Sequence, residues 1–231
     1  ADHRISESVL EMLSSQFPDD DLCSEETAEE ESTALEAEFA WVLDPIDGTN
    51  NFALGIPECA ISLALLRSGM PLYGWVYDFP SDRVLHGGAG RGLFSGEKRL
   101  DCSSREFGIS IPVGLQFPVE GRILKKLLPL LETRRIRSLG SSTLEGLYIA
   151  LGLLEGAVDF RVKVWDIAAF FAFFPVVSSA SYIILVLNAF FPSYIMRVIN
   201  FATTGSLYSG STALPSSVNA TSFFLGIVSP L

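Results

Sequence analysis

Apolar side chains recur at helical spacing near the start of the chain, at Ile5, Val9, Met12, Leu13 and Phe17. Residues three or four apart lie on one face of a helix, so this spacing favours an amphipathic helix. Pro18 and three aspartates follow directly and end the pattern. The sequence therefore predicts one helix over residues 4–17.

Short apolar runs bounded by turn residues predict strands further along the chain. Residues 39–43 form one run, which we expect to end at Asp44-Pro45 because the residue before a proline avoids helix. Residues 60–67, 72–78 and 82–86 form three more runs with turn residues between them, and they predict an antiparallel meander. The glycines at 87, 88, 90 and 92 predict a tight turn region.

Strand and helix patterns alternate in the next part of the chain. Strands are predicted over residues 108–115, 134–139 and 157–160, and helices over residues 122–131 and 141–154. Alternation of this kind is typical of mixed layers of helices and sheets. The expected fold class is α/β, in the form of an α+β layered sandwich.

Composition and charge exclude some classes of function. The 231 residues carry a formal net charge of −11, which argues against a protein that binds nucleic acid through a basic face. Ten carboxylates and no Lys or Arg lie between Asp19 and Glu38, a block typical of a solvated surface. The three cysteines are widely spaced and without a CxxC pair, which favours a reducing compartment and predicts a cytoplasmic protein.

The stretch from Asp44 to Phe52 carries the most specific chemistry, at the end of a predicted strand. Asp44 and Asp47 are two carboxylates three residues apart, and the carbonyl of Ile46 lies between them, so the stretch can supply oxygen ligands to Mg²⁺. Gly48-Thr49 can present backbone N–H groups to a phosphate. A plain turn rich in Asp, Pro and Gly is the alternative.

Asp44 to Phe52 resembles the DPxDGTxNF signature of the inositol monophosphatase family, the Mg²⁺-dependent, lithium-sensitive sugar phosphatases. Two further segments follow the family order: Ser24 to Thr27 resembles its GEES segment, and Val164 to Ala169 resembles its WDxAAG segment. The resemblance covers about Ala1 to Ala169 and lacks the beginning of the family pattern. It implies a sugar-phosphatase fold that is incomplete at both ends.

The resemblance also implies a role for individual residues. Glu25 and Asp44, with the Ile46 carbonyl, would hold one Mg²⁺, and Asp44, Asp47 and Asp166 a second. A metal-activated water, helped by Glu25 and Thr49, would attack the phosphorus. The catalytic set implied in this way is Glu25, Asp47, Thr49 and Asp2, where Asp2 would pair with Thr49 or would simply begin a helix.

Substrate contacts are implied at three places. Gly48 and Thr49 would receive the phosphate, Gly140-Ser141-Ser142 would contact the substrate or only cap a helix, and Asp159 and Asp166 would bind near its hydroxyls. The expected substrate is a small polyol or sugar phosphate, inositol monophosphate first, with fructose 1,6-bisphosphate or a nucleotide bisphosphate as alternatives in the same superfamily. The formation of a homodimer is left open as a possibility.

The composition changes after Asp166, because Arg197 is the only charged residue from Phe170 to Leu231. The predicted organisation is a metal-site domain over 1–105, a partial second domain over 106–169 and an uncharged tail over 170–231. A membrane segment over 167–196 and a non-native translated sequence are the two interpretations of the tail. Phe170 stands where the family has glycine, which puts the packing around Asp166 in doubt. An inactive truncated or membrane-associated chain is therefore the rival hypothesis.

Overall fold

The predicted apolar runs lie in the strands of a seven-stranded sheet, where they are buried. The computed structural model describes residues 1–28, 37–88, 90–100, 110–173 and 184–186. The strands of this sheet are hydrogen-bonded in sequence order. They are β1 (Asp21–Ser24), β2 (Phe39–Asp47), β3 (Ala60–Arg67), β4 (Met70–Asp78), β5 (Arg83–Gly88), β6 (Gly92–Ser95) and β7 (Lys98–Leu100).

The meander prediction is confirmed, because every neighbouring pair from β2 to β7 is antiparallel. Two details differ from the sequence prediction. β2 continues through Asp44 and Pro45 to Asp47 instead of ending at the proline. Gly87, Gly88 and Gly92 lie within paired strands instead of in a turn, with Gly88 opposite Gly92.

A second sheet has four strands in the order β11-β10-β8-β9, and its paired strands are parallel. They are β8 (Val113–Leu115), β9 (Ile136–Arg137), β10 (Gly156–Asp159) and β11 (Ile184–Val186). The predicted strands over 108–115 and 134–139 are therefore shorter in the structure, and residues 108 and 109 lie outside the described residues. The division of the chain into domains at residues 105 and 106 stays a prediction.

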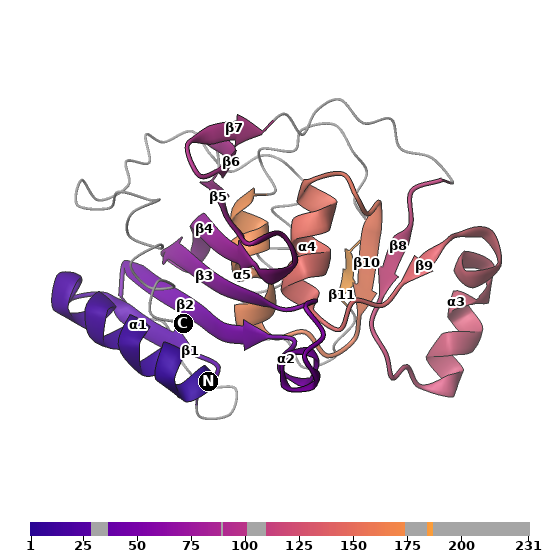
Figure 1. Ribbon diagram of the computed structural model, residues 1–231, viewed down its shortest axis with the longest axis horizontal. Helices are drawn as coiled ribbons and strands as arrows, with labels where there is room; N and C mark the ends of the chain where they lie inside the picture. Colours follow the sequence, from indigo (N-terminus) through magenta and orange to yellow (C-terminus); the bar gives the residue numbers. More distant parts are fainter. Residues whose placement is uncertain (29–36, 89, 101–109, 174–183, 187–231) are drawn as a thin grey trace.

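The helices complete a layered arrangement (Figure 1). In that view α1 is followed by the large sheet, then by α4 and α5, then by the small sheet and α3. The helices are α1 (Asp2–Gln16), α2 (Thr49–Leu54), α3 (Gly121–Thr133), α4 (Ser142–Ala150) and α5 (Val164–Phe173), with a short 3-10 turn at Phe79–Ser81. The predicted helix over 141–154 thus ends four residues early.

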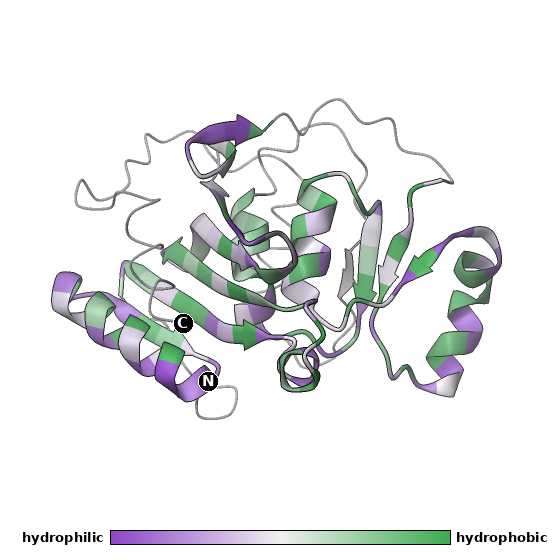
Figure 2. Ribbon diagram, in the orientation of Figure 1, coloured by the Kyte–Doolittle hydropathy of each residue, from purple (hydrophilic) through white to green (hydrophobic). Residues whose placement is uncertain are grey.

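Two apolar clusters lie on the two faces of the large sheet. Ile5, Val9 and Leu13 of α1 pack with Trp41 and other residues on one face. α4 and α5 pack on the other face, where Phe170 and Phe173 are buried. Neighbouring residues of β3 face opposite clusters, so the strand is apolar on both sides, as a sheet covered on both faces requires. Figure 2 shows the corresponding apolar ribbons in the centre of the molecule.

Phe170 is accommodated by a small residue opposite it. The side chain of Phe170 is 2% exposed and lies against Gly146 of α4, where an added Cβ would come within 2.8 Å of the ring. The doubt about packing at this position is thus resolved, since the bulky ring fills space that a glycine on the facing helix leaves. α5 continues through Phe170 to Phe173.

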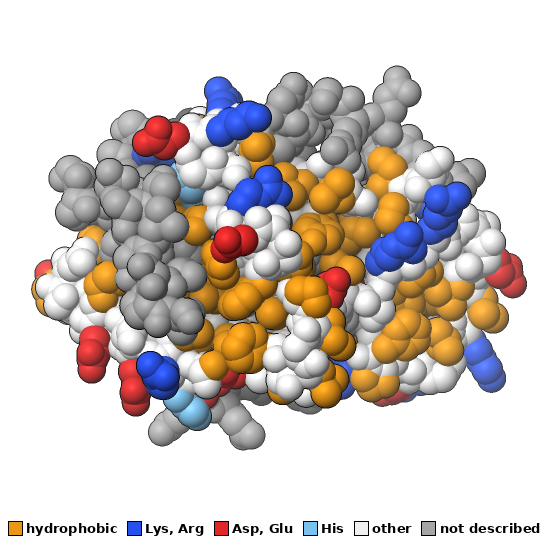
Figure 3. Space-filling view, viewed as in Figure 1, with side chains coloured by type: hydrophobic (Ala, Val, Ile, Leu, Met, Phe, Trp, Pro, Cys, Tyr) orange, Lys and Arg blue, Asp and Glu red, His pale blue; other side chains and the backbone are white. Residues whose placement is uncertain are grey.

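Large apolar side chains are exposed on the surface around α2 and α3. Figure 3 shows apolar side chains gathered over both helices. Phe52, Leu54 and Ile56 are exposed at α2, and Leu128 is exposed on α3. Among the described residues no helix is long and apolar enough to cross a membrane. Most of the predicted tail, residues 174–183 and 187–231, lies outside the described residues.

Candidate metal centre

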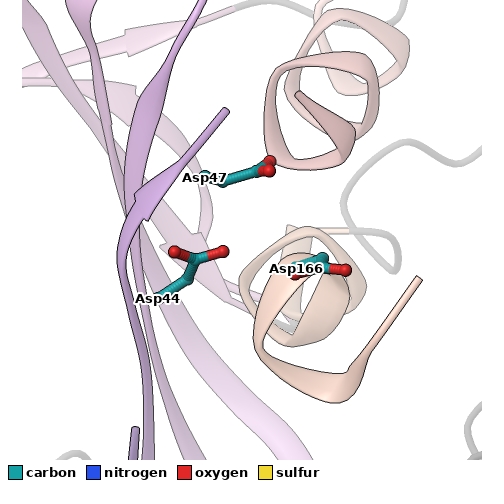
Figure 4. A group of neighbouring side chains, drawn as sticks. All are labelled: Asp44, Asp47 and Asp166. Carbon is teal, nitrogen blue, oxygen red and sulfur yellow. The ribbon is translucent and has the colours of Figure 1, made fainter. Parts of the chain in front are cut away.

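Three carboxylates from two distant parts of the sequence meet between the large sheet and α5 (Figure 4). Asp44 and Asp47 come from the end of β2, and Asp166 comes from the first turn of α5. One carboxylate oxygen of each residue lies within 4.8 Å of the others. The structure thus brings together three of the residues that the sequence predicts as metal ligands.

A bulge in β2 explains why Asp44 and Asp47 can act together. Residues three apart in a regular strand point to opposite faces of the sheet. Asp44 pairs with Ser62 and Asp47 pairs with Ala60, so β2 has one more residue than β3 between these two pairs. The extra residue turns both carboxylates to the same side. Pro45 is tolerated in the strand because it lies in the bulge.

The three carboxylates repel one another without a cation, and Asp44 is buried whereas Asp47 and Asp166 are half-buried. The side chain of Asp44 is 1% exposed, and its Oδ1 atom has no hydrogen-bond partner among the described residues. Burial raises the pKa of Asp44 well above its ordinary value, and Asp47, Asp166 and Glu25 raise this pKa further. Burial, followed by the charge of Asp47, likewise raises the pKa of Asp166.

A hard divalent cation fits these residues. It would supply the positive charge that the close carboxylates require, and it would coordinate the unpartnered Oδ1 of Asp44. Carboxylate and carbonyl oxygens suit Mg²⁺ or Ca²⁺, whereas softer metals prefer nitrogen and sulfur. The donor set therefore agrees with a metal centre of the magnesium type.

The first turn of α4 holds the acidic residues in place. Ser141 Oγ donates to Asp47 Oδ2 at 2.8 Å, and the N–H of Thr143 donates to the same oxygen. These hydrogen bonds favour the ionised form of Asp47 and lower its pKa, but burial outweighs them and the pKa is raised. Thr143 Oγ1 also donates to the Asp166 carbonyl at 3.0 Å.

Ser141 and Ser142 are engaged with the protein itself. Ser141 caps α4, because its Oγ accepts a hydrogen bond from the N–H of Leu144. Ser142 Oγ donates to Asp159 Oδ2 at 2.5 Å, and the N–H of Arg161 donates to Asp159 Oδ1 at 2.8 Å. The substrate contacts expected for Ser141, Ser142 and Asp159 stay predictions.

Thr143 is the residue of this turn that the sequence analysis missed. Its role could not be recognised from its side chain, because its main contact with Asp47 uses the backbone N–H, which is common to nearly all residues. Its place in the first turn of a capped helix was the available signal, since the N–H groups there have no partner within the helix.

Glu25 lies at the edge of the cluster, directly after β1. Its N–H donates to the Leu43 carbonyl at 3.1 Å, which places it beside the end of β2. Burial raises the pKa of Glu25, and a hydrogen bond with Asp44 opposes this change. Glu26, Asp47 and Asp2 raise the pKa as well, so Asp2 lies near enough to act on Glu25. The metal role of Glu25 stays a prediction.

Thr49 begins α2 and contacts the predicted carbonyl ligand. Its Oγ1 donates to the Ile46 carbonyl at 3.0 Å. Gly48 precedes the helix in the left-handed conformation, with φ of 88°, and an added Cβ would lie 2.9 Å from the Glu58 carbonyl. Glycine is therefore required at position 48 both by its conformation and by its surroundings. The expected pair of Asp2 and Thr49 stays a prediction.

Glu145 is another residue that the sequence analysis missed, and its carboxyl group is buried. It lies in α4 and is 1% exposed. Burial, with a smaller contribution from Asp159, raises the pKa of Glu145 to about 9. The group is therefore neutral at physiological pH, unlike an ordinary glutamate. It lies within α4 on a helical pattern that marks the position only as buried, so no chemical signal pointed to it.

Comparison with known proteins agrees with this geometry. The sequence model of the inositol monophosphatase family matches residues 1–172. The putative Nus factor SuhB of Neisseria meningitidis serogroup B is 34% identical over 173 residues, which cover 72% of this chain and 66% of that protein. The inositol-1-monophosphatase of Mesorhizobium japonicum is 34% identical, covering 61% of this chain and 56% of that enzyme.

This chain is also similar to a relative whose name combines two activities. The fructose-1,6-bisphosphatase/inositol-1-monophosphatase of Thermotoga maritima is 32% identical, over 73% of this chain and 64% of that enzyme. The chain thus spans less than two thirds of the length of each of these three relatives.

Solved structures confirm the predicted fold class. A dual specific IMPase/NADP phosphatase bound with D-inositol-1-phosphate superimposes with a TM-score of 0.67 at 25% identity, covering 76% of this chain and 68% of that one. An IMPase/NADP phosphatase complexed with Mg²⁺ and phosphate gives a TM-score of 0.66 at 25% identity, with coverages of 76% and 66%.

Proposed function

The chain belongs to the inositol monophosphatase family, and from this premise we propose that it hydrolyses a small phosphomonoester, with inositol monophosphate as the first candidate substrate. The meeting of Asp44, Asp47 and Asp166 between β2 and α5 is the observation that carries the proposal. A carboxylate cluster of this kind would repel a phosphate unless cations were bound to it. The activity therefore depends on a divalent metal, and we propose Mg²⁺.

The surroundings of Asp44 and Ile46 support their proposed roles as metal ligands. Asp44 would hold the cations together with its acidic neighbours, because it is buried and the charges of Asp47, Asp166 and Glu25 all raise its pKa. The carbonyl of Ile46 would add an oxygen ligand from the bulge. Mg²⁺ at such a site supplies positive charge to the phosphate oxygens and acidifies water.

The chain's own groups would bind and orient the phosphate. The N–H groups of Gly48 and Thr49 lie at the start of α2 and have no partners within the helix, so they can donate to an anion. Thr49 keeps its hydroxyl near the cluster through its hydrogen bond to the Ile46 carbonyl. Glu25, the most exposed carboxylate of the set, is the group through which a proton of the attacking water could leave.

Asp159 and Ser142 would meet the alcohol part of the substrate. Both oxygens of Asp159 already accept hydrogen bonds, from Ser142 and from the N–H of Arg161. A polyol hydroxyl would have to replace Ser142 or share Asp159 with it. This requirement favours a substrate with several hydroxyls near its phosphate, such as inositol monophosphate.

Fructose 1,6-bisphosphate is the second candidate substrate. The name of the Thermotoga maritima relative, which is 32% identical to this chain, combines the two activities. The two candidates differ in charge, since the bisphosphate carries a second phosphate group. Relative kcat/KM values for the two compounds decide between them.

Release of inorganic phosphate tests the proposal. The purified chain should release phosphate from inositol 1-phosphate when Mg²⁺ is present and should stop when a chelator removes the metal. Asp44→Asn should lower kcat by at least about a hundredfold, because it removes one charge from a metal ligand. Asp19→Asn is the matched control, since Asp19 is exposed and lies outside the cluster. A folded chain without turnover on any of the candidate substrates would refute the proposal.

A further inference from the structure

The side chain of Asn51 connects α2 with the start of α4. Its Nδ2 donates to the Glu58 carbonyl at 2.7 Å and to the Leu139 carbonyl at 2.8 Å. Glu58 follows α2, whereas Leu139 is 88 residues away from Asn51 and lies just before Gly140. One amide group therefore ties the turn of the metal motif to the turn that begins α4.

The turns at Gly48 and Gly140 approach each other closely at this junction. Gly140 has a φ of 76°, and an added Cβ would lie 2.7 Å from Asn51 Nδ2 and 3.1 Å from Asn51 Oδ1. An added Cβ at Gly48 would lie 3.2 Å from the Gly140 carbonyl. The turn at Gly48 and the turn at Gly140 are thus in contact, with Asn51 beside them.

The residues that follow Gly140 hold the metal cluster. Ser141 Oγ and the N–H of Thr143 donate to Asp47 Oδ2, and Thr143 Oγ1 donates to the Asp166 carbonyl. These donors belong to the first turn of α4, so their position depends on where the turn at Leu139 and Gly140 is held. Asn51 binds that turn directly.

We propose that Asn51 is a positioning residue, which sets the placement of the α4 donors on Asp47 and thereby the metal affinity of the cluster. This inference rests on the proposed function in that the cluster must bind a divalent cation. Residues that orient metal ligands from outside are worth about 10- to 100-fold in affinity. Asn51 acts one step further out, through Ser141 and Thr143.

The chemistry of the side chain explains why asparagine is needed. Both acceptors are backbone carbonyls, so the bridging group must donate two hydrogen bonds from one atom. A primary amide nitrogen does this, whereas an ionised aspartate has no donor and a serine hydroxyl has one. Asn51→Asp keeps the shape of the side chain, removes both donors and places a carboxylate against two carbonyl oxygens.

The matched control is provided by the neighbouring residue. Asn50 is exposed on the same short helix, and Asn50→Asp adds the same charge one residue away. A general effect of negative charge on cation binding would appear in both variants. An effect that depends on the two hydrogen bonds of Asn51 would appear only at position 51.

The experiment measures Mg²⁺ binding to the full chain by titration calorimetry, after circular dichroism has established that each variant is folded. Asn51→Asp and the uncharged Asn51→Ala should both weaken Mg²⁺ binding by about tenfold, and Asn50→Asp should stay within about twofold of the wild type. Unchanged binding in folded Asn51 variants would overturn the inference, as would failure of both variants to fold, because the residue would then be structural.

A double-mutant cycle with Ser141→Ala gives the second readout. If Asn51 acts through the α4 turn, the loss in Mg²⁺ affinity of Asn51→Ala and Ser141→Ala together should be smaller than the product of the single losses. Independent, multiplicative losses would overturn the inference. A wild-type chain that binds Mg²⁺ but hydrolyses no phosphoester would refute the proposed function and leave this inference standing.

Discussion

The contact between α5 and β4 gives a prediction about the support of the metal centre. Gly74 of β4 lies under Ala169 of α5, and an added Cβ would be 2.6 Å from the Ala169 carbonyl oxygen, 2.8 Å from its Cα and 3.0 Å from its carbonyl carbon. All three are backbone atoms, which cannot rotate away as a side chain can. Gly74→Ala should therefore push α5 away from the sheet, together with Asp166 three residues earlier.

The expected cost follows from the size of this overlap. Overpacking a core by one methyl group costs about 1–3 kcal/mol, and a rigid backbone neighbour places Gly74→Ala at the upper end, about 3 kcal/mol. For a chain of this size that corresponds to a decrease in Tm of about 6–12 °C. The displacement of Asp166 should also weaken Mg²⁺ binding in the fraction that remains folded.

Thermal unfolding followed by circular dichroism measures the effect. Gly121→Ala is the matched control, because Gly121 lies at the start of α3 with no atom within 4 Å of an added Cβ. The control should melt at or slightly above the wild-type temperature, since alanine favours helix. A Gly74→Ala variant that melted within about 2 °C of the wild type would refute the close contact between α5 and β4.

Three further predictions concern the cluster and its surroundings. Ser141→Ala should lower the free energy of unfolding by about 1–2 kcal/mol, since it removes the cap of α4, and urea denaturation checks this. Glu145→Gln should stabilise the protein increasingly as the pH rises from 4.5 towards 9: burial raises the folded pKa of Glu145 from its ordinary 4.5 to about 9, so its stabilising contribution is complete below 4.5 and is lost as the pH rises to 9. Equal pH dependence of the two Tm values would contradict this. Mg²⁺ should raise the Tm more at about pH 8 than at about pH 5, because cations bind the deprotonated carboxylates whose pKa values burial has raised; an equal increase at both would refute it.

Local patterns made the strands and the metal motif predictable. The strands from β3 to β5 follow apolar runs whose ends are set by turn residues, and these signals act within a few residues. Asp44 and Asp47 were recognisable because their spacing and their neighbours are specific. The same local signals predicted the end of β2 too early. Pro45 is tolerated in the strand only because of a bulge, and this bulge depends on the pairing of β2 with β3.

Contacts between distant residues were beyond the sequence patterns. Thr143 uses its N–H to hold Asp47, and Asn51 reaches Leu139 across 88 residues, so neither interaction has a spacing that could be read along the chain. Phe170 looked incompatible with a close-packed helix because its partner, Gly146, is known only from the packing of α4 on α5. Residue chemistry predicts which groups can bind a metal, whereas packing decides what holds them.

Crystals soaked in Mn²⁺, with anomalous diffraction recorded at the manganese absorption edge, show whether the carboxylate cluster binds a metal ion. We expect an anomalous peak between Asp44, Asp47 and Asp166, with carboxylate oxygens coordinated to the ion, and no such peak in crystals of Asp44→Asn. Ordered carboxylates without a peak at saturating Mn²⁺, or a peak confined to another part of the surface, would contradict the assignment of this cluster as a metal centre.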